Sequence, residues 1–155
     1  MKVQNDRGGV NMSTHGVEAF ATTVQKTNAW LNELMEDLAW DNRHWTYLAL
    51  RTGLHILRDH LTIEEATDLG AQLPMLVRGF YYEGWTLTGK PVKERRKEDF
   101  LNHIRDAFRN EGRIDPEQVM RAVCRLLSRR VSAGEISDVK QLLPVALHHW
   151  WPSIT

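Results

Sequence analysis

The chain has 155 residues, about one domain, and 42% of them are hydrophobic against 26% charged. This composition excludes a disordered chain, and the formal net charge of zero argues against a protein whose whole surface binds nucleic acid. The single cysteine excludes an internal disulfide and a multi-cysteine metal site, and no apolar run reaches the roughly 20 residues of a membrane-spanning helix.

The N-terminal segment, residues 1–13, is polar, contains adjacent glycines and has no helical period, so we expect it to be disordered. It also lacks the apolar stretch and cleavage site of an export signal. Together with the single cysteine, this favours a reducing, cytoplasmic location without membrane association. Residues 14–155 are expected to form one domain.

The first half of that domain has the pattern of amphipathic helices. Apolar residues recur at spacings of three, four or seven from Val17 to Leu38, which predicts one long helix with a continuous apolar stripe. A second helix follows Asp41, which can cap it. A third begins with a capping box, in which Thr62 and Glu65 each satisfy a backbone N–H of the other.

The second half continues in the same way. Pro74 ends the third helix and can serve as the first residue of a short fourth one. The segment 82–98 contains Gly89 and Pro91 and shows neither a helical nor a strand pattern, so it reads as a linker. Later helices are expected to start near Glu94, Asp115 and Ser132.

The two halves are related by an internal repeat. A shift of 70 residues lays positions 29–81 on positions 99–151 without a gap, with nine identities, and both capping boxes and both helix-breaking prolines coincide. Chance similarity between amphipathic helices is the alternative. The repeat predicts an all-α fold of about eight helices, with the two units packed about an approximate twofold axis. The expected division is repeat one 29–81, linker 82–98 and repeat two 99–151.

The zero net charge is a cancellation between the halves. Residues 1–84 hold 7 basic and 11 acidic residues, a net charge of −4, whereas residues 85–155 hold 13 basic and 9 acidic residues, a net charge of +4. Opposite charges should draw the halves together, either within one chain or head to tail between chains. The second arrangement would make the protein a homo-oligomer.

Two segments resemble a known family. Residues 57–66 read LRDHLTIEEA, close to the family's LRDRLTVEEA, and residues 71–85 read AQLPMLVRGFYYEGW, close to its AQLPxLIRGxYYEGW. From Phe20 to Pro152 the chain resembles the bacterial family catalogued as domain of unknown function 2267, with His60 in place of an arginine. The resemblance implies a helical bacterial protein and supplies no catalytic or binding residues.

Aromatic residues gather in two segments that the repeat superposes, 78–85 and 148–152. Aromatic side chains with a polar end suit a surface that a partner covers, and an adjoining arginine can contact a carboxylate or a ring. The alternative is that both segments fill the core at the repeat junction. The candidate binding residues are Arg78, Tyr81, Tyr82, Trp85, Trp150 and Trp151.

A basic face in the second half is the candidate for nucleic-acid binding. Arginines four positions apart share one helix face and could contact several phosphates, together with the basic linker. Arginines at a helix C-terminus also complement the helix dipole, which is a purely structural role. The residues of this face are Lys93, Arg95, Arg96, Arg121, Arg125 and Arg129.

Catalytic and metal sites have little support in the sequence. Acidic residues crowd around the start of the third helix and could serve a hydrolase, but Glu65 already has a capping role. His55 and Asp59 share a helix face, yet no HExxH motif and no cysteine pair accompany them. Cys124 coincides with Leu54 in the repeat, so we expect a buried, unreactive thiol. We therefore expect no catalytic residue, metal or cofactor.

The sequence thus predicts an interaction or scaffold module that binds another protein through the aromatic segments or the groove between the repeats. Nucleic-acid binding through the basic second half is one alternative. A hydrolase that uses Asp, Glu and His residues near the second and third helices is the other.

Overall fold

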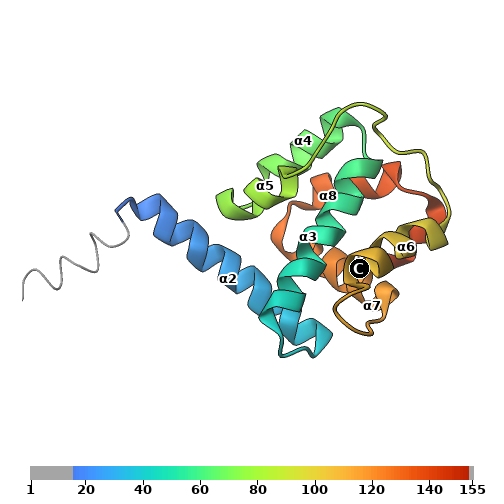
Figure 1. The fold of residues 1–155 in the computed structure, drawn as a ribbon. Coiled ribbons are helices and arrows are strands. Elements are labelled where there is room, and N and C mark those ends of the chain that lie inside the picture. The colour runs from blue at the N-terminus through green and yellow to red at the C-terminus, as the bar shows by residue number, and fades with distance from the viewer. Residues whose placement is uncertain (1–15, 154–155) are drawn as a thin grey trace, which may run out of the picture.

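The computed structural model describes residues 16–153, so the expected disorder of residues 1–13 lies outside the described residues. Over this range the chain forms seven α-helices and one 3₁₀-helix and no strand, which confirms the all-α class with about eight helices (Figure 1). The elements are α2 (Glu18–Leu38), α3 (Arg43–His60), α4 (Ile63–Ala71), α5 (Met75–Tyr82), α6 (Lys97–Phe108), α7 (Pro116–Arg130), α8 (Ala133–Leu142) and the 3₁₀-helix η1 (Val145–Trp150).

Helix α3 lies at the centre of the bundle and packs against α2, α4, α5, α6 and α7 (Figure 1). Its leucines Leu50, Leu54 and Leu57 are completely buried, as the apolar period of this segment requires. Gly53 lets α7 come close, because a Cβ atom at this position would lie 2.9 Å from Cγ2 of Val123. The core therefore forms around the contact between α3 and α7.

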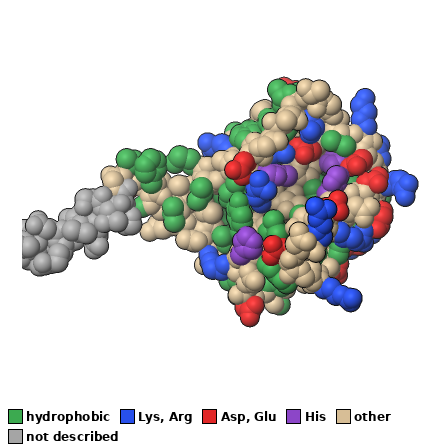
Figure 2. All heavy atoms as spheres, in the orientation of Figure 1, with side chains coloured by type: hydrophobic (Ala, Val, Ile, Leu, Met, Phe, Trp, Pro, Cys, Tyr) green, Lys and Arg blue, Asp and Glu red, His purple; other side chains and the backbone are tan. Residues whose placement is uncertain are grey.

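The first half of α2 projects from this core (Figure 1). Val17, Phe20 and Val24 are 51%, 57% and 47% exposed, and Figure 2 shows hydrophobic side chains along the projecting helix. Only the second half of the helix contributes to the core, through residues such as Trp30 and Leu34. The predicted apolar stripe is therefore buried only in its second half; the N-terminal end of α5 reaches α2, through a hydrogen bond from the Leu76 N–H to Thr23, but leaves these three side chains exposed.

Helix ends follow the local signals with small differences. Thr62 accepts a hydrogen bond from the Glu65 N–H at 3.1 Å, and Ser132 accepts one from the Glu135 N–H at 3.3 Å. The cap of α3 is Asn42, not Asp41, and its side chain accepts from the Trp45 N–H. The helix expected near Glu94 begins at Lys97, and Pro74 and Pro144 stand just before α5 and η1 as N-cap residues.

Helix boundaries recur at the spacing of the repeat. α6 and α7 end at Phe108 and Arg130, 70 positions after the last residues of α2 and α3, Leu38 and His60. α8 begins 70 positions after the start of α4. The packing of the two units about a twofold axis stays a prediction, as does the division of residues 14–155 into two repeats within one domain.

Candidate binding groove

The opposite charges of the two halves meet between α2 and α7. Arg125 donates to Asp37 through Nε at 2.9 Å and through Nη2 at 3.0 Å. One turn further along α7, Arg129 donates to Glu33 at 3.0 Å, and Arg130 contacts the same carboxylate. These contacts show the attraction within one chain, and a head-to-tail homo-oligomer stays a prediction.

The predicted basic face consists of arginines on α7 that are paired with carboxylates and of linker residues that, among the described residues, are not. Arg121 also has a carboxylate partner, Glu117, at 3.2 Å, so all three α7 arginines of the predicted face are paired. The other members lie on the linker, where Lys93, Arg95 and Arg96 are exposed. In the described part of the chain these three have no carboxylate partner.

The predicted aromatic residues do not form one exposed surface. Tyr81 is completely buried and donates its hydroxyl hydrogen to the Ala66 carbonyl at 2.6 Å. Trp150 and Trp151 are 2% and 4% exposed. Their positions match the core alternative that the sequence left open.

The remaining members of that set, in and just after α5, have local structural contacts. Arg78 donates to the carbonyls of Gly70 and Leu73, which lie at and just beyond the end of α4. Tyr82 and Trp85 are half-buried and stack on each other with ring centroids 5.5 Å apart. Arg78 therefore ties α5 to the end of α4 and adds a second donor at the Gly70 carbonyl, which also accepts from the Leu73 N–H.

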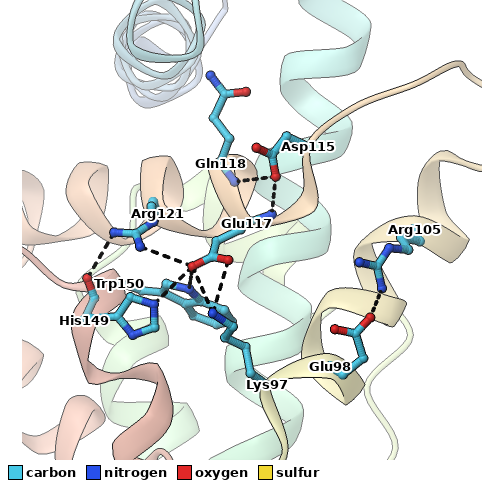
Figure 3. A network of polar contacts seen from close by, with 9 residues as sticks. All are labelled: Lys97, Glu98, Arg105, Asp115, Glu117, Gln118, Arg121, His149 and Trp150. Carbon is cyan, nitrogen blue, oxygen red and sulfur yellow. Dashed lines mark hydrogen bonds and ion pairs between the residues drawn. The ribbon is translucent and has the colours of Figure 1, made fainter.

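A carboxylate of α7 fixes the C-terminal 3₁₀-helix (Figure 3). Glu117 accepts hydrogen bonds from Trp150 Nε1 at 3.3 Å, from His149 Nε2 at 3.1 Å and from Lys97 Nζ at 3.3 Å. The hydrogen bond from His149, with those from Lys97 and Trp150, lowers the pKa of Glu117 to about 2 against the opposing effect of burial. The network anchors η1 on α7 and thereby sets the position of the residues that follow it.

Those residues close one side of a pocket of about 700 Å³ between α7 and α8, which we call the α7–α8 groove. Its apolar lining comes from Ala133, Ile136, Trp151 and Pro152. Three cationic side chains, a histidine and four neutral polar side chains complete the lining, and no carboxylate of the described chain contributes to it. The charged and titratable lining residues are Arg125, Arg129, Lys140 and His148.

The groove unites parts of both predicted sets. Trp151 belongs to the aromatic candidates, and Arg125 and Arg129 belong to the basic face. The indole Nε1 of Trp151 is buried and has no hydrogen-bond partner among the described atoms. The structure thus brings an aromatic side chain and guanidinium groups together where the sequence had treated them as two separate sites.

The contribution of α8 to the groove was missed by the sequence reasoning. Ala133, Ile136 and Lys140 recur at spacings of three and four, so they share one face of α8. That period was visible in the sequence. This face becomes part of a groove only because η1 packs on α7. That packing is a tertiary contact, and no pattern in the local sequence predicts it.

The acidic residues considered for a hydrolase are held in structural contacts. Asp59 accepts from Arg58 Nε at 2.8 Å. Among the described hydrogen bonds Glu65 does not reach back to cap its own helix; its carboxyl group lies close to that of Glu135, across the contact between α4 and α8, and one oxygen of each is buried without a partner. Burial, with the neighbouring carboxyl group of Glu65, raises the pKa of Glu135 to about 8.

The thiol of Cys124 is completely buried, as expected, and burial raises its pKa far above the usual range. Such a thiol is unreactive at neutral pH. Across residues 16–153, none of the helices combines the length and hydropathy needed to cross a membrane.

The fold and the groove define an all-helical protein with a cation-rimmed apolar pocket. The family model described as "Uncharacterized conserved protein (DUF2267)" matches residues 27–150, and the chain belongs to this family. The resemblance found in residues 57–66 and 71–85 is therefore confirmed, whereas the bacterial origin that it implies stays a prediction. A comparison with curated proteins gives no match.

Proposed function

We propose that this protein is a binding module whose α7–α8 groove takes an acidic peptide segment of another protein. The observation that carries this proposal is the lining of the groove, in which apolar residues occur together with three cationic side chains and no carboxylate of the described chain. An apolar side chain of the partner would lie against the exposed Ala133 and Pro152 and would reach only the small exposed parts of Ile136 and Trp151. Flanking carboxylates would meet the charged rim, which gives the interface its specificity.

The rim retains hydrogen-bond donors for such a partner. Lys140 has no carboxylate within ion-pair distance in the described part of the chain. Asp37 occupies Nε and Nη2 of Arg125, and Nη1 has no partner among the described hydrogen bonds. A guanidinium carries five N–H donors, so an arginine that is already paired can bind a second carboxylate.

Nucleic acid is a weaker candidate for the same surface. A phosphate backbone is recognised by an extended row of net positive charge, and along α7 the carboxylates of Glu33, Asp37 and Glu117 cancel that charge even though single N–H donors remain. A short acidic peptide needs only the few donors at the rim of one pocket. We place this interaction in the cytoplasm, as the composition and the lone cysteine suggest.

Selection from a library of random ten-residue peptides tests the proposal with the full chain as bait. The selected peptides should combine acidic residues with one large apolar residue. Ser137 is exposed on α8 and lines the groove, so Ser137→Trp should fill the pocket and abolish enrichment. Lys140→Glu should weaken binding of a selected peptide at least tenfold, about 1.4 kcal/mol.

Lys93→Glu makes the same charge change on the exposed linker and serves as the matched control. It should leave peptide binding unchanged. Enrichment that persists in the Ser137→Trp protein would overturn the proposal, as would the enrichment of basic peptides. A single-stranded oligonucleotide that competes for the bait and loses affinity with Lys93→Glu would favour the nucleic-acid alternative instead.

A further inference from the structure

Three polar side chains from separate segments converge beside α3. His60 is the last residue of α3, Glu94 lies in the linker, and His103 lies on α6. The Nε2 atoms of His60 and His103 lie 2.9 Å and 2.8 Å from the same oxygen, Oε1 of Glu94. One ligand atom from each of the three residues thus falls within 4.8 Å of the others. Figure 2 shows histidine side chains among charged groups on the face that it presents.

The hydrogen bond of the second nitrogen of His60 determines which group can lie between its Nε2 and the Glu94 carboxylate. Its Nδ1 is 2.7 Å from the carbonyl oxygen of Ile56, which can only accept a hydrogen bond. The proton of a neutral His60 is therefore on Nδ1, and its Nε2 turns a lone pair towards the Glu94 carboxylate. Two lone pairs at this distance repel each other. A proton or a metal cation between these two atoms removes the repulsion.

The donor set suits a transition-metal cation. Two imidazole nitrogens and one carboxylate oxygen are the protein ligands of zinc sites that keep one position open. The hydrogen bond of His60 Nδ1 to a backbone carbonyl is the outer contact that orients a metal-bound histidine. Zinc bonds of about 2.1 Å require ligand atoms about 3.4 Å apart in a tetrahedral arrangement, so the contacts would widen by about half an ångström. The partly exposed Glu94 and His103 can make that adjustment.

Space for a further ligand adjoins these residues. A pocket of about 260 Å³ is lined by His60 and His103 together with His55 and Asp59. His55 is engaged with the Phe80 carbonyl at 2.7 Å, and Asp59 with Arg58. The pocket can therefore admit water or a small anion to the open position, while its walls are held in place by other contacts.

We propose that His60, Glu94 and His103 bind a zinc ion, with the open position towards this pocket. The site shares no residue with the α7–α8 groove and does not depend on its function. Bound zinc would join the end of α3, the linker and α6. The ion would thereby restrain the linker. In the described structure one backbone hydrogen bond joins the linker to α3, from the Val92 N–H to the Asp59 carbonyl at 2.8 Å.

Titration of the untagged, chelator-treated chain with zinc sulfate tests the site, and cobalt reports its geometry through visible absorption. We expect one zinc per chain, and an affinity at least tenfold lower for His103→Gln. His60→Arg replaces the histidine with a fixed cation that can pair with Glu94, so this variant should fold normally and lose the cobalt spectrum. The matched control is His44→Gln, because His44 is exposed and lies outside the cluster.

Equal zinc affinities of the wild-type, His103→Gln and His60→Arg proteins would overturn the proposal. So would a wild-type chain that takes up no zinc and has the same melting temperature with and without the ion. In that case a proton and not a metal ion lies between the imidazole of His60 and Glu94, and the cluster is a set of hydrogen bonds only.

Discussion

Arg125 and Asp37, 88 positions apart in the sequence, form an ion pair with two parallel hydrogen bonds of 2.9 Å and 3.0 Å. This geometry matches the planar guanidinium to both carboxylate oxygens, which makes it the strongest form of a surface ion pair. The pair joins the acidic first half of the chain to the basic second half. It also fixes the guanidinium that stands at the rim of the α7–α8 groove.

Removal of this pair should lower the free energy of unfolding. The two side chains are 36% and 23% exposed, so water screens them only in part. We expect Asp37→Asn and Arg125→Met to be coupled by about 1 kcal/mol in a double-mutant cycle measured by urea denaturation. The exposed pair Arg105 and Glu98 is the control and should show a smaller coupling. Equal coupling energies for the two pairs would contradict the importance of the two-point contact.

Glu117 should contribute stability that depends on pH. Its pKa falls from the ordinary 4.5 to about 2 in the folded chain, chiefly through the hydrogen bond from His149. A lowered carboxyl pKa stabilises the folded state above pH 4.5, and this contribution disappears as the pH falls towards 2. Glu117→Gln should therefore cost about 1–2 kcal/mol at pH 7, after allowance for solvent screening.

Unfolding measured from pH 7 down to acid should show the wild-type and Glu117→Gln curves converging. Glu64→Gln, on the exposed first turn of α4, serves as the control and should leave the profile unchanged. A constant difference between the wild-type and Glu117→Gln proteins at every pH would show that the substitution acts through packing around Trp150, not through charge.

The carboxyl pair of Glu65 and Glu135 should have the opposite pH dependence. The pKa of Glu135 is raised to about 8 by burial and by its contact with Glu65, so the folded chain retains a proton that the unfolded chain releases. Stability is unaffected below pH 4.5 and declines as the pH rises towards 8. Glu135→Gln keeps the shape and removes the ionisable group, so it should raise the melting temperature at pH 9 by several degrees and change it little at pH 4.

Asp138→Asn is the matched control for this pair, since Asp138 is an exposed neighbour on the same helix. Its effect on the melting temperature at pH 9 should be smaller. If Glu135→Gln destabilised the chain at pH 9, the two carboxylates would have to be bridged by a cation and not by a proton.

Local signals predicted the helices because each depends on neighbours in sequence. The Thr62 and Ser132 caps need only a hydroxyl three residues before a free N–H, and both form, although the return bond from Glu65 that a capping box requires is not among the described hydrogen bonds. The long helix from Val17 was also predicted, but its exposed first turns were not. Exposure depends on how far the other helices extend, which no periodicity within α2 encodes.

The candidate sites were harder to predict because they combine distant segments. Trp151 and Arg125 were each identified from composition, but only the folding of η1 onto α7 places them on one groove. His60 and Glu94 are 34 positions apart and meet because the linker returns along α3. Helical spacing in the sequence indicates only ligands that share one helix face. It therefore pointed to His55 with Asp59 and gave no sign that His60 and Glu94 meet.

The close approach of α3 and α7 should make Gly53 intolerant of even one added carbon. A Cβ atom there would lie 2.9 Å and 3.1 Å from the two methyl groups of Val123, and a β-branched side chain cannot turn away easily. Alanine favours a helix over glycine by about 1 kcal/mol, but overpacking a core contact costs about 1–3 kcal/mol. We therefore expect Gly53→Ala to lower the free energy of unfolding by about 1 kcal/mol.

Gly79 provides the matched comparison, because it is also helical and a Cβ there would meet no atom within 4 Å. Gly79→Ala should stabilise the chain by about 0.5–1 kcal/mol through helix propensity alone. Val123→Ala alone removes buried methyl groups and destabilises the chain, but Gly53→Ala should cost less in that background than in the wild-type chain, since the added methyl group then has room. Urea denaturation of the four variants measures both effects. If Gly53→Ala stabilised the chain as much as Gly79→Ala, the two helices would have to separate without cost, and the contact between α3 and α7 would not limit the packing of the core.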